Sequence, residues 1–196
     1  MFANRFTAVI DACVLCSPLK RNLILSLAEA ELFRVRWSDE IMDETEKAIT
    51  SILSKRDYDD ASERAEQARS IMNQAFAEAT VVEYEHLGNG IGKLPDEGDR
   101  HVIAAAIKSK ADIIVTENLK DFPRKVLAEY GIEAKSSDEF IADVINLSPS
   151  LAIAAIERMR LRLDRPEKSP DILLLDMEKT GLTQAADQLR DSVKLI

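Results

Sequence analysis

The sequence predicts an α/β fold, in which a mainly parallel central sheet carries helices on both faces and a small helical appendage follows. Three observations support this prediction. Short apolar runs alternate with helical segments over the first 147 residues, which is typical of parallel strands joined by crossover helices. After Ser148-Pro149 the pattern becomes wholly helical. A chain of 196 residues, 46% hydrophobic and 31% charged, suffices for one core with an appendage.

Five strands are expected where apolar and β-branched side chains gather, at residues 6–10, 32–37, 80–84, 112–116 and 132–134. Helices are expected between and after these strands at about residues 18–30, 39–55, 59–78, 97–110, 123–130 and 137–145. Ser38 precedes two acidic residues and is the predicted N-cap of the 39–55 helix. Gly131 is expected to end the 123–130 helix.

The appendage should contain three helices, at residues 150–163, 171–179 and 183–192. Pro166 and Pro170 are expected to break the chain before the second helix, and Gly181 to separate the second from the third. We therefore predict two domains, an α/β domain at residues 1–147 and a helical extension at residues 148–196.

The net charge of −9 is unusual for a nucleic-acid enzyme, which ordinarily carries a basic face. The acid is unevenly distributed, because residues 37–100 hold sixteen acidic against seven basic side chains, a net charge of −9. The remaining segments nearly balance, at +2 for residues 1–36 and −2 for residues 101–196. This concentration favours bound cations or a basic partner protein. No apolar run approaches a membrane span and the N-terminus does not resemble a secretory signal, so we expect a cytoplasmic protein.

Four acidic residues stand where a folded chain would otherwise place apolar or neutral ones. Asp11 follows the strand at 6–10 and Asp121 follows the strand at 112–116, and ligands bind at the carboxyl ends of parallel strands. Glu44 lies on the inner flank of a helical apolar stripe, and Asp99 shares the buried face of its helix with Ile103. Four carboxylates crowded together form a site for hard divalent cations.

Simpler structural roles are open for each acid taken alone. Asp96 fits an N-cap and Asp99 a first-turn acid, Glu44 fits the boundary of an amphipathic helix, and Asp121 fits a turn before Phe122-Pro123. The joint occurrence of four acids at matching structural positions favours a site. Cys13 and Cys16 form a C-x-x-C pair without a redox context or a second pair of zinc ligands, so we expect two small, inert thiols at the start of a helix.

Four segments carry a resemblance to a known family. They are Val9-Ile10-Asp11-Ala12, Ser38 to Glu44, Asp96 to Ala106, and Val115-Thr116 with Asn118-Leu119-Lys120-Asp121-Phe122-Pro123. Together these segments resemble a PIN domain, in particular the toxin-like branch related to VapC ribonucleases. The resemblance covers about residues 6–145, and its last two segments are the most specific. It implies a PIN-like three-layer α/β/α fold with the parallel sheet between helices.

The resemblance also implies a metal-dependent endoribonuclease that hydrolyses RNA phosphodiester bonds as the toxin of a toxin–antitoxin pair. Family members bind Mg²⁺ or Mn²⁺ through three or four acids, and the matching positions are Asp11, Glu44, Asp99 and Asp121. A small antitoxin and a homodimer are implied as partners. The candidate polar helpers and RNA contacts are Thr116, Asn118, Asp96, Arg100 and Lys120, with Lys93 and Arg124 flanking the site.

The sequence departs from the family pattern in two places. Many relatives carry Asn two residues after the first Asp, where this chain has Cys13. The tail beyond Ser148 lies outside the core pattern and resembles the C-terminal extension of one bacterial subgroup. Two other functions stay open: a catalytically weak interaction module with the same fold, and a phosphatase that uses Asp11 as its nucleophile. Such phosphatases usually carry a second Asp where Cys13 stands.

Overall fold

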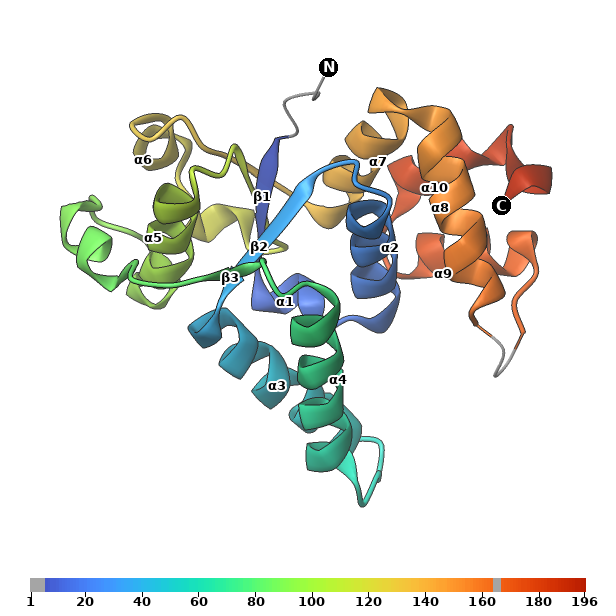
Figure 1. Ribbon diagram of the computed structural model, residues 1–196, viewed down its shortest axis with the longest axis horizontal. Coiled ribbons are helices and arrows are strands. Elements are labelled where there is room, and N and C mark those ends of the chain that lie inside the picture. The colour runs from blue at the N-terminus through green and yellow to red at the C-terminus, as the bar shows by residue number, and fades with distance from the viewer. Residues whose placement is uncertain (1–5, 164–166) are drawn as a thin grey trace. The chain divides into compact units, whose positions relative to one another are not determined.

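The computed structural model describes residues 6–163 and 167–196 and divides the chain into two compact units (Figure 1). The first, called here the sheet unit, comprises the chain up to Ser17 and Arg34–Lys135. The second, the helical unit, comprises Pro18–Phe33 and Ser136–Ile196. The boundary between residues 147 and 148 stays a prediction, and the predicted break at Pro166 lies outside the described residues.

The sheet unit is built on five parallel strands in the order β3-β2-β1-β4-β5. The strands are β1 (Thr7–Ile10), β2 (Arg34–Ser38), β3 (Thr80–Val81), β4 (Ile113–Val115) and β5 (Glu133–Lys135). All four residues of β1 are buried, as expected for a central parallel strand. The predicted fold class, an α/β fold with a parallel central sheet and additional C-terminal helices, is confirmed.

Helices of the sheet unit connect these strands. They are α1 (Ala12–Leu15), α3 (Asp39–Ser54), α4 (Ala61–Ala75), α5 (Arg100–Ser109) and α6 (Arg124–Ala128), with 3₁₀ turns η1 (Glu85–Gly90), η2 (Glu97–Asp99) and η3 (Leu119–Asp121). The Ser38 side chain accepts a hydrogen bond from the Ile41 N–H at 3.2 Å, so the predicted N-cap of α3 is confirmed. Helices α3 and α4 pack side by side (Figure 1), joined by Arg69, which binds Asp43 and Glu46.

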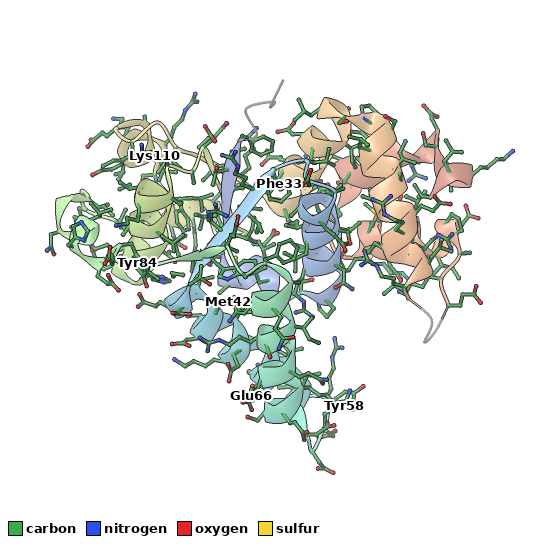
Figure 2. The ribbon with its side chains drawn as sticks, in the orientation of Figure 1. Phe33, Met42, Tyr58, Glu66, Tyr84 and Lys110 are labelled. Atoms are coloured by element: carbon green, nitrogen blue, oxygen red, sulfur yellow. The ribbon has the colours of Figure 1, made fainter. Side chains whose placement is uncertain are left out.

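The helical unit contains α2 (Pro18–Glu29), α7 (Ser137–Leu147), α8 (Pro149–Leu161), α9 (Pro170–Lys179), α10 (Thr183–Arg190) and η4 (Val193–Leu195). Phe33, labelled in Figure 2, packs edge-to-face on Phe140 of α7 with ring centroids 4.9 Å apart. Asp138 of α7 is 8% exposed, and its carboxylate accepts hydrogen bonds from the Gln184 and Ala185 N–H groups at the start of α10. These contacts fix the first turn of α10 against α7.

The clearest differences from the sequence prediction concern β3 and α1. The strand expected at 80–84 ends at Val81, because Glu83 adopts a left-handed backbone conformation with φ of 57° that a strand cannot contain. Helix α1, which the sequence did not predict as a separate element, is a single turn directly after Asp11. Among residues 6–163 and 167–196, no helix is both long and apolar enough to cross a membrane.

Candidate active site

Asp11 lies at the carboxyl end of β1, in the centre of the sheet unit. Strand register places Ile10 opposite Val115, so the next residues of the two strands, Asp11 and Thr116, are neighbours. The Asp11 N–H donates to the Val115 carbonyl at 3.0 Å, which continues the β1–β4 pairing by one residue. Asp11 is 4% exposed, and its Oδ1 accepts from the Ala12 N–H at 2.6 Å as the N-cap of α1. Its carboxylate is therefore buried and fixed by the backbone.

Two side chains donate to the other oxygen of this carboxylate. The Thr116 hydroxyl, which is fully buried, donates to Asp11 Oδ2 at 2.7 Å. The Cys13 thiol donates to the same oxygen at 3.0 Å. Burial, followed by the negative charge of Asp11, raises the pKa of Cys13 to about 12. Cys13 therefore stays protonated at neutral pH and acts as a hydrogen-bond donor, whereas the sequence suggested only an inert thiol.

Asp99 ends η2 and stands as N-cap of α5, but its side chain makes no capping hydrogen bond. Burial, followed by the negative charges of Asp11, Asp96 and Asp121, raises the pKa of Asp99 to about 6. Two of the other predicted acids, Asp11 and Asp121, are thus close enough for their charges to act on Asp99. Asp96 contributes charge but also has a local role, because its carboxylate accepts from the Gly98 N–H at 2.8 Å as the N-cap of η2.

Glu44, the fourth predicted acid, contacts a buried histidine, His101. The Glu44 side chain on α3 is 46% exposed, and Oε1 lies 3.2 Å from Nε2 of His101 on α5. The buried His101 also has Glu40 3.7 Å from its Nδ1. Burial alone lowers the pKa of His101, but the hydrogen bond to Glu44 and the charges of Glu44, Glu40 and Asp11 outweigh it, so the net pKa is raised.

The predicted RNA-contacting residues divide into two groups. Asn118 and Lys120 are exposed beside Asp121, and the Asn118 backbone N–H donates to the Thr116 hydroxyl at 3.0 Å. Arg100 instead organises the preceding loop, because its guanidinium donates to the carbonyls of Gly88 at 2.9 Å and Ile91 at 2.7 Å and pairs with Glu97. Lys93 and Arg124 are exposed.

The side chains of this site are chemically suited to bind a hard divalent cation. The carboxylates around Asp99 supply only oxygen ligands, which Mg²⁺ and Mn²⁺ prefer. A cation among them would also relieve the repulsion that raises the pKa of Asp99. In the part of the chain that the structure describes, no three His, Cys, Asp or Glu side chains lie close enough to enclose an ion. Some side chains would therefore have to turn inward on binding.

Comparison with known families agrees with this geometry. The family profile of the PIN domain matches residues 7–120, which is more than half of the chain. The chain belongs to the PIN domain family. The matched range includes the strands and helices that carry Asp11, Glu44 and Asp99, and it ends one residue before Asp121. A second profile, the VapC50 C-terminal domain, matches residues 137–191, which lie within the helical unit.

One curated relative supports the resemblance to the VapC branch. The chain is 41% identical over 76 residues to "Putative ribonuclease VapC50" of Mycobacterium tuberculosis (strain ATCC 25618 / H37Rv). The match covers 39% of this chain and 45% of that protein, so it spans less than half the length of the relative. No solved structure matches the chain. The predicted assignment, a VapC-like PIN domain with a C-terminal extension, is confirmed.

Sequence reasoning did not find His101 as part of this site. The apolar stripe of the 97–110 helix is marked by Ile103, and His101 lies two residues away from Ile103, about 200° around the helix. The structure buries α5 on nearly all sides, from His101 to Ala106. The unbroken apolar run that follows His101 was the available signal for such a helix.

Proposed function

We propose that this PIN domain protein is a metal-dependent endoribonuclease that hydrolyses RNA phosphodiester bonds. The observation that carries the proposal is the buried Asp11 carboxylate at the carboxyl end of β1, with Asp96, Asp99 and Asp121 near enough that the charges of Asp11, Asp96 and Asp121 raise the pKa of Asp99. Like charges held this close cost stability, and a cation site is the simplest reason for a protein to keep them. Membership of the PIN family and the similarity to a ribonuclease of the VapC group also support it.

Asp11, Asp99 and Asp121 are the proposed ligands of Mg²⁺ or Mn²⁺, with Glu44 as a further ligand. A bound ion of this kind stabilises negative charge on a phosphate and makes a water molecule easier to deprotonate. The chain supplies the positioning. Thr116 and Cys13 orient Asp11 through its Oδ2, and donors of this kind around a ligand typically contribute 10–100-fold in metal affinity or activity.

Exposed basic and polar side chains near these acids are the proposed RNA contacts. Lys120 is exposed on η3, and Asn118 is exposed just before it. Both can bind the phosphates of an RNA strand. Lys93 and Arg124 are exposed as well. Arg100 is proposed to act indirectly, by holding the carbonyls of the Gly88–Gly92 loop.

We further propose that the protein is the toxin of a toxin–antitoxin pair in the cytoplasm and forms a homodimer. A small antitoxin would block the site by presenting a basic side chain to its carboxylates, because the excess negative charge of residues 37–100 attracts cations. Expression with and without the product of a neighbouring short reading frame tests this part. Toxicity that the second product relieves supports a toxin–antitoxin pair, and growth unaffected by either product argues against it.

RNA cleavage by the purified protein tests the enzymatic proposal. Labelled RNA should be cut with Mg²⁺ or Mn²⁺ and stay intact with EDTA. Asp11→Asn should lower the rate at least about 100-fold, since it removes a ligand worth several kcal/mol of transition-state stabilisation. Asp59→Asn, which removes an exposed acid between α3 and α4, is the matched control and should cut at the wild-type rate.

The same assay separates the other functions. A folded protein that cuts no RNA with either metal is an interaction module. Hydrolysis of a small phosphomonoester, abolished by Asp11→Asn while RNA stays intact, would identify a phosphatase instead.

A further inference from the structure

The position of Glu44 differs from that of the other proposed ligands. Asp99 responds to the charges of Asp11, Asp96 and Asp121, whereas Glu44 stands on α3 with a side chain that is 46% exposed. A glutamate with several rotatable bonds loses conformational entropy worth about 1–2 kcal/mol when it is held in one position. If Glu44 is to bind an ion together with the aspartates, another group must hold its carboxylate near them.

His101 makes that contact. Its Nε2 lies 3.2 Å from Glu44 Oε1, and its ring is anchored because the side chain is only 8% exposed within α5. His101 also lies near Asp11, since the charge of Asp11 acts on its imidazole. His101 therefore pairs with Glu44 from α5, two residues after Asp99, and its imidazole also responds to the charge of Asp11.

The other ring nitrogen indicates how the imidazole is used. Nδ1 is buried and has no hydrogen-bond partner among the residues that the structure describes, and Glu40 Oε2, at 3.7 Å, is too distant for a hydrogen bond. The Tyr84 hydroxyl (Tyr84 is labelled in Figure 2) donates to the same Glu40 oxygen at 3.4 Å. A neutral imidazole with its proton on Nε2 donates to Glu44 and leaves Nδ1 bare, and a charged one also donates to Glu44. The Nε2 contact is thus available in both protonation states.

We propose that His101 is a positioning residue, which holds the Glu44 carboxylate beside Asp11 and Asp99 through the hydrogen bond from its Nε2. The inference rests on the proposed function, because it gives Glu44 a purpose only if the carboxylates bind a divalent ion. It predicts that His101 and Glu44 act as one unit.

Two conservative substitutions distinguish this role from simple packing. The amide nitrogen of glutamine reaches the place of Nε2, whereas that of asparagine reaches only the place of Nδ1. His101→Gln should therefore keep the hydrogen bond to Glu44, and His101→Asn should lose it. If His101 only fills space, the effects of the two substitutions on Mn²⁺ binding should follow side-chain volume and protein stability. They should then be independent of Glu44.

Equilibrium binding of Mn²⁺, followed by water proton relaxation without RNA, is the decisive readout. His101→Asn should raise the dissociation constant of Mn²⁺ about 10- to 100-fold, while His101→Gln should stay within about 3-fold of wild type. Glu44→Gln should weaken binding by a similar factor. The double variant His101→Asn/Glu44→Gln should be no weaker than Glu44→Gln alone, because residues that act through one contact are not additive. His86→Asn, at an exposed histidine of η1, is the matched control and should not change binding.

The outcomes distinguish this inference from the proposed function. If Asp99→Asn abolishes Mn²⁺ binding but His101→Asn and Glu44→Gln leave it unchanged, the role of His101 is refuted and the metal site stands. If Asp99→Asn has no effect on Mn²⁺ binding, the metal site itself fails. Should His101→Asn not fold, Glu44→Gln still decides, because wild-type affinity in that variant overturns the proposal.

Discussion

Replacing Asp99 with asparagine should stabilise the metal-free protein at neutral pH. The pKa of Asp99 rises from 3.8 to about 6 through burial and the charges of Asp11, Asp96 and Asp121. At about 1.36 kcal/mol per pKa unit, this rise has an upper limit of about 3 kcal/mol. Because the carboxyl is only partly buried, solvent screening reduces the expected effect to about 1 kcal/mol.

The sign of the pH dependence follows from linkage. A carboxyl whose pKa is higher in the folded state than in the unfolded state binds its proton more tightly when folded. Its contribution to stability is present below pH 3.8 and is lost as the pH rises through about 6. Wild type should therefore lose about 1 kcal/mol relative to Asp99→Asn between pH 4 and pH 7.5.

Urea denaturation in EDTA, at pH 4 and at pH 7.5, measures this difference. Asp59→Asn removes one charge at an exposed position and serves as the control. Saturating Mn²⁺ should reverse the order at pH 7.5, because only wild type keeps the full set of ligands. An Asp99→Asn variant that is no more stable than wild type at pH 7.5, or whose advantage is equally large at pH 4, would refute the reasoning.

Three further predictions concern single contacts. Cys13→Ala should lower the free energy of unfolding by about 1 kcal/mol by removing a donor to Asp11, whereas Cys13→Ser should keep it, and urea titration compares the two. Arg100→Lys should speed amide hydrogen exchange in residues 88–92, measured by mass spectrometry, because a lysine cannot bind several carbonyls at once; unchanged exchange contradicts its structural role. Asp138→Ala should cost about 1–3 kcal/mol by leaving the first turn of α10 uncapped, and a melting temperature equal to that of wild type would contradict this.

Much of the fold could be predicted from the sequence because its local signals agree with its tertiary structure. The acids of residues 39–40 after Ser38 locate the start of α3, and the apolar run before Asp11 locates the central strand. The end of β3 could not be predicted, since the left-handed conformation of Glu83 depends on tertiary context and not on its residue type. The position of Pro18–Phe33 among the helices of the second unit likewise requires knowledge of long-range packing.

The site shows the same limit. The prediction that Asp11, Asp99 and Asp121 converge follows from strand ends and helix starts that meet at one edge of a parallel sheet, and Asp99 responds to the charges of the other two. The hydrogen bonds of Cys13 and His101 could not be predicted, because they join residues whose proximity depends on the exact register of β1 with β4 and on the rotation of α5. Hydrophobic periodicity predicts one buried face of a helix, whereas α5 is buried on more than one face.

The most direct test of the central claim is the anomalous scattering of manganese in crystals grown with Mn²⁺. The account predicts a peak bounded by the carboxylates of Asp11, Asp99 and Asp121, which disappears in Asp99→Asn. A peak elsewhere on the molecule, or no peak at a manganese concentration that supports RNA cleavage, would contradict it.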